Sequence, residues 1–416
     1  MNVAIWLAAA FVVFSVAIHF ASVAITACQV VKARRPARPG SEPPITILRP
    51  VCGIDYDAEA TLRSTFELDW PDYEVIFCSA NEADPVVPLV ERLIAEYPQM
   101  PARLLTGDDR ISINPKLNNL VKGWQAASHQ WIVMSDSNVV LPPDFLKRLM
   151  ARWTPGTGLV CSPPIGGQAE GFAAELECAF LNTFEARWQN VAGAIGLGFA
   201  QGKTMLWQRG LLDGVGGVAA LARETAEDAA ATKVVRSAGL LVRLDPGPFI
   251  QPLGRRDFRS VWNRQVRWAR LRRASFKLFF LPELLAGGFA PLAAAAFLVG
   301  TETIPILALG GLVGSWYGAE FVLARLAGWH FSAQSVPALI LRDLLIPPLW
   351  VLAWAGNGFN WRGNAMRIER APSRMMLAKI VELAGKAARV NQLLTRGMLP
   401  ASISRRRRTR IDRSNP

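Results

Sequence analysis

The sequence has few of the residues from which disulfide frameworks, zinc sites and phosphate loops are built. Its five cysteines include no Cys-x-x-Cys pair, and an odd number without metal spacing is typical of reduced, mostly buried thiols. The three histidines also lack ligand spacing. Gly193, Gly196 and Gly198 have no strand, loop and lysine around them that would form a phosphate loop. These absences argue against a disulfide-rich fold, a Cys/His zinc site and a phosphate-loop nucleotide site.

Acidic residues are also scarce relative to basic ones, with 33 Asp and Glu against 46 Lys and Arg, a formal charge of +13. The basic residues cluster after residue 31, between Arg255 and Lys277, and from Arg405 to Arg410. Such clusters could bind nucleic acid. Because they adjoin apolar segments, an anionic membrane surface is the favoured partner, at about 1 kcal/mol per basic residue. We therefore predict a bilayer partner and no nucleic acid.

Long apolar segments flank a polar central region. Val3 to Val31 carries no formal charge apart from His19, and it exceeds the roughly 20 residues that cross a bilayer core. The basic residues follow this segment, starting at Lys32, which favours a permanent anchor over residues 1–32 with the chain beyond it in the cytoplasm. Three further apolar segments cover about 278–300, 303–327 and 334–356.

The third of these apolar segments contains Arg342 and Asp343, which must be paired or face protein or water. Three full crossings would put the basic tail of residues 357–416 outside, against the positive-inside rule. We therefore expect the first or the third segment to lie in the interface or to re-enter the membrane. Residues 278–356 are predicted to hold these membrane segments.

The polar region, residues 40–277, alternates short apolar runs with helical patterns. Strands are expected at 45–48, 73–78, 102–105 and 131–134, and helices at 58–67, 85–97, 116–127, 171–188, 224–238 and 261–277. Short strands that alternate with helices of about ten residues predict an α/β fold with parallel strands and crossover helices. Ligands of such sheets bind at the carboxyl ends of the strands, where Arg49, Asp84 and Asp136 are expected.

Asp136 follows a predicted strand directly and is the candidate metal ligand. A carboxylate there can bind Mg²⁺ or Mn²⁺ while the cation holds phosphate oxygens, and such a cation assists a departing nucleotide diphosphate. The alternative is an Asp that caps a loop. Asp84 could contact the ribose or base of a nucleotide, or could cap a helix that starts at Pro85.

Asp228 is the candidate general base, because glycosyl transfer needs a carboxylate to accept the proton of the attacking hydroxyl. Its alternative is a solvated acidic helix turn. Arg264, Arg267 and Trp268 share a helix face by their spacing. Two guanidinium groups can hold a diphosphate, and an indole can pack against a sugar or lipid. The same pattern also fits a basic interfacial helix with a belt tryptophan.

Lys116 and Asn118 could meet phosphate or base, although capping of a helix N-terminus would explain them equally well. Together, spaced carboxylates followed by an Arg/Trp cluster beside a membrane favour a site that moves a sugar from an anionic nucleotide donor to a lipid. A non-catalytic membrane transporter or scaffold stays open as an alternative of a different class.

The chain resembles the ceramide glucosyltransferase family of inverting glycosyltransferases with a GT-A fold. The resemblance rests on segments spread over nearly the whole chain in order: Leu48–Pro50 with Gly53, Phe66–Asp69, Asp84–Pro85, Ile113–Leu120, Ser135–Ser137, Gln168–Ala174, Gly202, Glu227–Asp228, Arg264–Trp268 and Trp361–Gly363.

This resemblance implies a Rossmann-like GT-A domain, UDP-glucose as donor and ceramide as acceptor. It implies that Asp84 and Asp136 bind donor and metal, that Asp228 is the base, and that Arg264 with Arg267 and Trp268 forms the family's Arg-Trp element. Position 138 is Asn138, where an Asp-x-Asp motif would have its second Asp, so metal binding would depend mainly on Asp136. For a bacterial member, the expected location is the inner membrane, with the catalytic domain facing the cytoplasm.

Similar bacterial enzymes glycosylate hopanoids, so two points stay open within the resemblance. The donor sugar could be galactose or N-acetylglucosamine, and the acceptor could be a hopanoid or another lipid.

Overall fold

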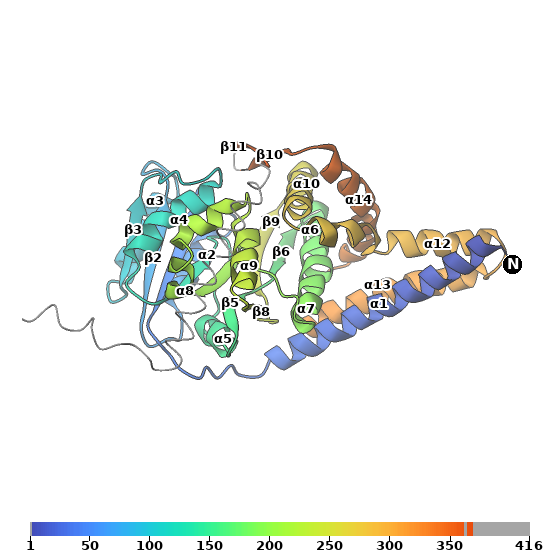
Figure 1. Ribbon diagram of the computed structural model, residues 1–416, viewed down its shortest axis with the longest axis horizontal. Helices are drawn as coiled ribbons and strands as arrows, with labels where there is room; N and C mark the ends of the chain where they lie inside the picture. The colour runs from blue at the N-terminus through green and yellow to red at the C-terminus, as the bar shows by residue number, and fades with distance from the viewer. Residues whose placement is uncertain (1, 362–363, 369–416) are drawn as a thin grey trace, which may run out of the picture. The chain divides into compact units, whose positions relative to one another are not determined.

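The computed structural model describes residues 2–361 and 364–368, and its centre is a seven-stranded sheet in the order β3-β2-β1-β4-β7-β5-β8 (Figure 1). The strands of this sheet are β1 (Ile45–Val51), β2 (Tyr73–Ser79), β3 (Ala102–Thr106), β4 (Trp131–Ser135), β5 (Thr157–Cys161), β7 (Thr204–Gln208) and β8 (Leu241–Leu244). The four strands expected from the sequence are all present, each extended by one to three residues at its carboxyl end.

One strand that was not predicted from the sequence, β7, runs antiparallel to its neighbours. β1 pairs in parallel with β2 and β4, and β2 with β3, as expected, but β7 is antiparallel to both β4 and β5. Because β7 runs the other way, its first residues lie at the carboxyl end of β4, with Thr204 opposite Ser135. Residues just before β7 therefore join the edge of the sheet where ligands were expected.

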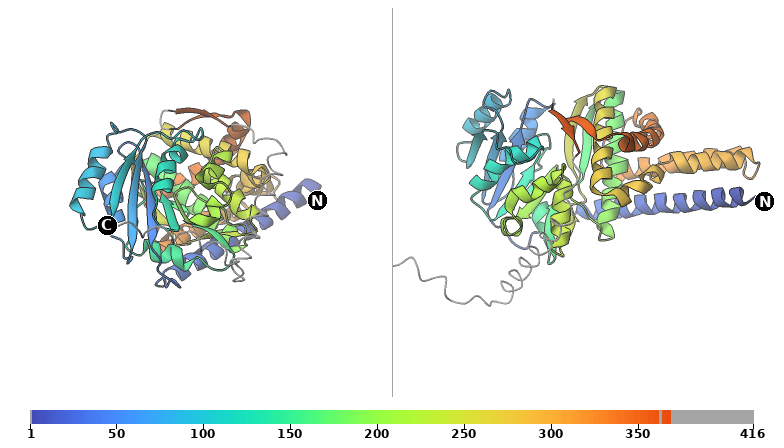
Figure 2. Two further views of the ribbon diagram at one scale, coloured as in Figure 1. Left: turned by 60° about the vertical axis from the view of Figure 1, so that its left-hand side comes forward. Right: turned by 45° about the horizontal axis from the view of Figure 1, so that its top comes forward.

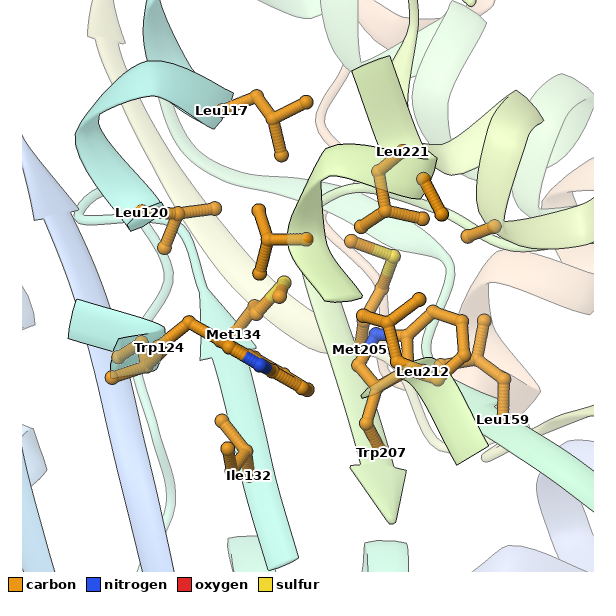
Figure 3. Close-up of a cluster of buried hydrophobic side chains, with 14 of the residues drawn as sticks. Leu117, Leu120, Trp124, Ile132, Met134, Leu159, Met205, Trp207, Leu212 and Leu221 are labelled. Atoms are coloured by element: carbon orange, nitrogen blue, oxygen red, sulfur yellow. The ribbon is translucent and has the colours of Figure 1, made fainter. Parts of the chain in front are cut away.

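Helices cover both faces of the sheet, which explains why its strands are continuously apolar. On one face, α2 (Ala58–Arg63), α3 (Val87–Glu96) and α5 (Phe145–Ala151) pack against side chains such as Ile47 and Val75. On the other, α4 (Pro115–Ala126), α8 (Arg209–Asp213) and α9 (Glu227–Ser237) pack against Leu48, Met134 and Trp207. Figure 3 shows this second core, with Trp124 and Trp207 among the side chains of α4, β4 and β7.

The expected helices at 58–67, 85–97, 116–127 and 224–238 are confirmed with shifted ends, the first of them closing in a 3₁₀ turn, η1 (Ser64–Phe66). A further 3₁₀ segment, η3 (Gly217–Arg223), precedes α9. The expected start of a helix at Pro85 is wrong, because α3 begins at Val87 with Pro88 in its first turn. Asp84 thus lies two residues before the N-cap residue Val86, whose backbone N–H its carboxylate accepts at 3.0 Å.

The rest of the polar region forms a smaller sheet and several helices. It contains the parallel pair β6 (Pro164–Glu170) and β9 (Phe249–Arg255). The expected helix at 171–188 is a continuous rod of α6 (Phe172–Ala179), the π-helix η2 (Phe180–Ala186) and α7 (Arg187–Ala194). The expected basic helix is α10 (Phe258–Ser275). β10 (Gly358–Trp361) and β11 (Asn364–Arg367) form an antiparallel pair, and β10 contacts α10.

Four segments of the described residues are long and apolar enough to cross a membrane, namely Val3–Ala33, Lys277–Gly300, Ile306–Ala327 and Ser335–Ala355. They form α1 (Val3–Ala33), the broken run α11 (Lys277–Phe280), η4 (Leu281–Leu285) and α12 (Phe289–Gly300), then α13 (Ile306–Ala327) and α14 (Ser335–Ala355). Figures 1 and 2 show α1 running beside α12 and α13, with which it is in contact.

The first C-terminal segment is interrupted, as α12 has only 12 residues. At 1.5 Å per residue a helix of this length covers about 18 Å, less than the roughly 30 Å of a bilayer core. This break favours the expectation that one segment does not cross fully, which stays a prediction. The basic tail from residue 369 lies outside the described residues.

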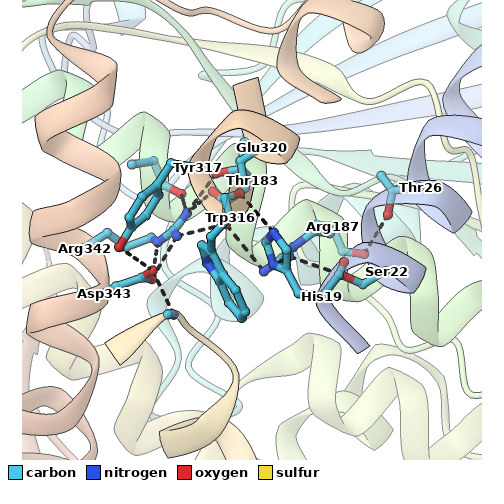
Figure 4. Close-up of polar contacts among 12 residues, drawn as sticks. His19, Ser22, Thr26, Thr183, Arg187, Trp316, Tyr317, Glu320, Arg342 and Asp343 are labelled. Carbon is cyan, nitrogen blue, oxygen red and sulfur yellow. Dashed lines mark hydrogen bonds and ion pairs between the residues drawn. The ribbon is translucent and has the colours of Figure 1, made fainter. Parts of the chain in front are cut away.

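Buried charged side chains connect the apolar helices α1, α13 and α14 to the continuous helix formed by α6, η2 and α7 (Figure 4). Arg342 of α14 pairs with its neighbour Asp343 at 2.8 Å and with Glu320 of α13 at 2.8 Å. His19 of α1 contacts the Arg187 guanidinium at 2.8 Å and stacks on Trp316 with ring centroids 3.7 Å apart. The expectation that Arg342 and Asp343 are paired is confirmed, and His19 is buried among these side chains.

Candidate active site

Asp136 lies at the carboxyl end of β4, between two lysines. Its carboxylate contacts Lys116 Nζ at 2.7 Å and Lys203 Nζ at 3.0 Å, and its backbone N–H donates to the Lys203 carbonyl at 3.0 Å. Lys203 Nζ also donates to Asn138 Oδ1 at 2.8 Å. Burial alone would raise the pKa of Asp136, but the two ammonium groups hold this pKa below its ordinary value. Asp136 is therefore an anion that two cations share.

The first turn of α4 presents Lys116 to this site. Asn114 caps the helix by accepting the backbone N–H groups of Lys116 and Leu117 at 3.0 and 3.2 Å. The same Asn114 donates to Glu227 Oε2 at 2.7 Å, and Lys116 Nζ contacts Glu227 Oε1 at 2.7 Å. Burial would lower the pKa of Lys116, yet Asp136 and Glu227 together raise it. Lys116 thus links the metal candidate on β4 to the acidic start of α9.

Asp228 occupies the first turn of α9, next to Glu227. Its Oδ2 accepts the Gly202 N–H at 3.1 Å, and its Oδ1 accepts the N–H of Ala229 at 2.8 Å. Burial, followed by the charge of Glu227, raises the pKa of Asp228 to about 6. A carboxylate with this pKa is ionised near neutral pH and is a better proton acceptor than an ordinary Asp.

The Arg-Trp element lines the same cavity from α10. Arg264 is held by an ion pair with Glu177, which is 1% exposed, and its guanidinium carbon lies 5.8 Å from the Trp268 ring centroid. The guanidinium carbon of Arg267 lies 5.5 Å from the ring centroid of Trp361 on β10. The sequence-based expectation that Arg264, Arg267 and Trp268 share one face is confirmed, since all three line the cavity.

One cavity of about 1080 Å³ collects most of the predicted site residues. Lys116, Asp136, Asp228, Arg264, Arg267 and Trp268 all line it. Three expected donor-binding residues, Arg49, Asp84 and Asn118, are absent from its lining. The structure therefore brings six of the nine together around one space.

The other three predicted residues support the loops around the cavity. Arg49 is fully buried and donates to the Ser137 and Val139 carbonyls at 3.3 and 3.2 Å, behind Asp136. Asp84 accepts the backbone N–H groups of Gly53 and Val86 at 2.8 and 3.0 Å. Asn118 Oδ1 accepts the N–H groups of residues 111 and 112, at 3.1 and 2.9 Å.

Sequence reasoning missed Lys203 and gave no separate role to Glu227. Lys203 escaped notice because β7 was not expected, so nothing predicted that the residue before Thr204 would lie beside Asp136. The neighbouring Gly202, one of the residues that carry the family resemblance, pointed to this region. A Cβ at position 202 would lie 2.7 Å from Glu227 Oε1 and 3.2 Å from Lys116 Nζ. Any larger residue at position 202 would therefore require the Glu227 and Lys116 side chains to shift.

The residues fit a hard divalent cation only together with donor phosphates. No group of three or more His, Cys, Asp or Glu in the described part of the chain could hold an ion. Asp136 and the Asn138 amide group, both in contact with Lys203 Nζ, carry the oxygen atoms after β4 that could serve as ligands. Mg²⁺ is commonly bound through one or two carboxylates plus substrate phosphates and water, so this donor set suits a cation that shares its ligands with a nucleotide diphosphate.

Relatives of known name are ceramide glucosyltransferases. Ceramide glucosyltransferase 3 of Caenorhabditis elegans is 25% identical over 338 residues, which cover 79% of this chain and 73% of the relative. Ceramide glucosyltransferase 1 of the same organism is 24% identical over 360 residues, covering 81% and 77%. The ceramide glucosyltransferase of Komagataella phaffii is 44% identical, but over 99 residues that cover 23% of this chain and 19% of the relative.

Among solved structures, a mannosyltransferase from Pyrobaculum calidifontis, in complex with GDP-Man and Mn²⁺, superposes with a TM-score of 0.47 at 18% identity. It covers 80% of this chain and 98% of its own.

The match to a family is much broader, because residues 11–373 fit the family described as Glycosyl transferase family 21. This match includes the whole sheet and all of the apolar helices except the first residues of α1, and the expected α/β fold with N- and C-terminal apolar helices is confirmed. The chain belongs to glycosyl transferase family 21.

Proposed function

We propose that this glycosyltransferase transfers glucose from UDP-glucose to a hydroxyl group of ceramide, with inversion at the anomeric carbon. The observation that carries the proposal is the single cavity in which Asp136, Asp228 and Arg267 meet beside apolar helices. The names of the relatives support the sugar and the acceptor. The predicted orientation, with the catalytic domain on the cytoplasmic side of a bacterial inner membrane, belongs to the same proposal.

Donor binding is assigned to the cationic wall of the cavity. Lys116 and Lys203 flank Asp136, and Arg264 and Arg267 face the same space from α10. Guanidinium and ammonium groups bind diphosphate oxygens through charge-assisted hydrogen bonds. Asp136, with Asn138, would hold a Mg²⁺ or Mn²⁺ ion, which supplies Lewis-acid neutralisation of the leaving group when bound.

Asp228 is assigned as the general base. The acceptor oxygen attacks the anomeric carbon, its proton passes to the Asp228 carboxylate, and the bond from carbon to the UDP oxygen breaks with its electron pair leaving on UDP. The lysines and arginines stabilise the charge that develops on UDP. One displacement of this kind, with the base opposite the leaving group, inverts the configuration.

Arg49, Asp84 and Asn118 are assigned supporting roles in donor binding. Each fixes backbone beside the cavity, and Arg49 in particular holds the loop that carries Asp136 through its bonds to residues 137 and 139. A change at Arg49 would displace Asp136 without removing a direct ligand of the donor.

Replacement of Asp228 by Asn tests the proposal most directly. The amide keeps the size of the side chain but cannot accept the proton, so the transfer rate should fall at least about 100-fold, the lower end of general-base contributions. Binding of UDP-glucose, measured by calorimetry, should change little. The matched control is Asp144→Asn, at a side chain 55% exposed outside the cavity, and it should leave the rate unchanged. Full activity in Asp228→Asn would remove this residue as the base.

The substrates are tested by incubating purified protein with UDP-glucose, UDP-galactose or UDP-N-acetylglucosamine and with ceramide or a hopanoid, followed by mass spectrometry. Glucosylceramide as the main product, with a β-anomeric signal in the NMR spectrum from the α-linked donor, is the expected result. A hopanoid product or another sugar would replace the substrates proposed above while keeping the reaction class.

A further inference from the structure

The cavity continues beyond the charged cluster into an apolar part. α10 lines the cavity along one face, first with Arg264, Arg267 and Trp268, then one and two turns later with Leu271, Arg272 and Ser275. The apolar part is bounded by side chains from three elements that are, or adjoin, the candidate membrane segments: Phe11, Phe14 and Ile18 of α1, Val191 of α7, and Phe279 and Phe280 of α11. An apolar chain from a bilayer could occupy this space.

Glu185 lines this cavity together with Arg272 and with its own neighbours Phe184 and Trp188, so that charged and apolar side chains both surround its carboxyl group. Glu185 belongs to the π-helix η2 and lines the cavity with a side chain that is 10% exposed. Its Oε1 is 3.6 Å from Arg272 Nη1, beyond hydrogen-bonding distance. Within the described residues this buried oxygen has no hydrogen-bond partner.

Arg272 is already committed to another carboxylate. Its Nε donates to both oxygens of Glu283 at 2.8 and 3.1 Å, and its Nη2 donates to Glu283 at 3.0 Å. Arg272 can therefore lower the cost of a charge on Glu185 but does not satisfy its oxygen. A buried polar atom without a partner costs about 1–3 kcal/mol, and short π-helices inside α-helices frequently mark functional sites.

The protonation of Glu185 agrees with a role in hydrogen bonding to a ligand. Burial, partly offset by Arg272 and reinforced by Glu283, raises the pKa of Glu185 to about 7. Near neutral pH the group can therefore accept a hydrogen bond as a carboxylate or donate one as an acid.

We propose that Glu185 is an acceptor-binding residue. Its carboxyl group hydrogen-bonds to the amide or hydroxyl group in the head of an amphipathic lipid, whose apolar chain lies between α1 and α11. This inference rests on the proposed function and adds to it the position and the polar recognition of the acceptor. It places the head of the lipid beside Arg272, two helical turns from Arg264 on α10.

The test compares acceptors as well as variants. Wild-type protein, Glu185→Gln and Glu185→Leu are assayed with short-chain ceramide and with its N-methyl and 3-deoxy analogues, at saturating UDP-glucose. Wild type should prefer ceramide to at least one analogue by about 5- to 150-fold in kcat/KM, the range set by an unsatisfied buried polar group. In Glu185→Leu this preference should shrink to less than threefold. The KM for ceramide should rise, while the KM for UDP-glucose and the slow hydrolysis of UDP-glucose without acceptor should stay the same.

A merely structural role would lower kcat for every acceptor alike and leave the preference unchanged. The control is Glu175→Gln, at another buried glutamate on α6 that bonds to Ser332 and Ser335 outside the cavity, and it should retain the wild-type preference. An unchanged preference in folded Glu185→Leu, with thermal unfolding as the check of folding, overturns the inference. If wild type makes no glycolipid from any acceptor, it is the proposed function that fails.

Discussion

Two clusters of buried charged side chains in this protein have similar compositions, but a ligand can reach only one of them. The cavity cluster consists of Lys116, Asp136, Lys203, Glu227 and Asp228, and the helix junction consists of Arg187, Glu320, Arg342 and Asp343. Both contain basic and acidic groups at 2.7–3.0 Å. In the junction Glu320 and Arg342 are 0% exposed, whereas Lys116, Asp136 and Lys203 are 11–22% exposed and line the cavity.

The partners of the two clusters explain what each can do. Arg342 is held by two carboxylates, by Thr183 Oγ1 at 2.8 Å and by the Ala179 carbonyl at 3.3 Å, all from protein. Lys116 and Lys203 face a space that a ligand can enter, so phosphate oxygens can replace or extend their contacts with Asp136. Burial and pairing alone therefore do not identify a functional charge, and access to a cavity makes the difference.

The largest expected effect on folding comes from breaking the junction. Arg342→Met leaves the buried Asp343 without its ion-pair partner and leaves Glu320 with only Arg187, 3.8 Å away, and it should cost about 3–5 kcal/mol of stability, seen as a lower thermal midpoint in detergent. Activity per folded molecule should be close to that of wild type. Arg325→Met on α13, at an exposed guanidinium over Phe321, is the matched control and should cost less than about 1 kcal/mol. Equal destabilisation by both would show that the junction is no more important than a surface charge.

The reverse pattern is expected for the cavity cluster. Lys116→Met removes a cation from the proposed diphosphate site, and the transfer rate should fall roughly 100-fold, in line with the loss of one group that stabilises transition-state charge. The stability loss should be smaller than for Arg342→Met, because Lys203 stays beside Asp136 and the cavity admits water. Lys122→Met on the same helix, whose Nζ contacts Asn119 and the Gly107 carbonyl, serves as the control. A pure loss of folding without loss of rate would assign Lys116 to structure.

Some residues of the helix junction and some of the cavity cluster could be predicted from the sequence, but their partners on other elements could not. Arg342 and Asp343 stood out because charges in an apolar segment must be paired, but their partner Glu320 could not be identified without the packing of α13. Asp136 and Asp228 were identifiable because each sits at the start of a loop or helix after a recognisable pattern. Lys203 depends on the antiparallel strand β7, and strand direction follows from tertiary packing rather than from local periodicity.

Tertiary packing also explains why three predicted donor-binding residues do not line the cavity. Arg49, Asp84 and Asn118 lie at or near strand ends and helix starts, where the sequence predicted ligand contact. The end of a strand fixes a residue's position but leaves the direction of its side chain open. Asp84 turns toward the N–H groups of Gly53 and Val86 and does not line the cavity.

A smaller effect is expected from filling the space at Gly202. In Gly202→Ala the new Cβ would meet Glu227 Oε1 at 2.7 Å and Lys116 Nζ at 3.2 Å, closer than ordinary contacts. The Lys116 and Glu227 side chains must then shift, and a misplacement of this size should lower kcat about tenfold. Gly210→Ala, on α8 with nothing within 4 Å of its Cβ, should leave kcat unchanged. Unaltered kcat in Gly202→Ala would mean that the Lys116–Glu227 pair tolerates displacement.

The last prediction concerns the dependence of the transfer rate on pH, which reports the protonation of Asp228 in the cavity. Burial and Glu227 raise the pKa of Asp228 to about 6, and the base must be ionised to accept a proton. The rate should therefore be constant above pH 7, fall to half near pH 6, and drop about tenfold for each unit below that, because protonation follows the pKa of the single group. Measuring kcat/KM from pH 5 to 8 gives this acid limb. In Glu227→Gln the loss of the neighbouring charge should move the midpoint to lower pH, whereas a limb that stays near pH 6 would assign the titration to a group other than Asp228.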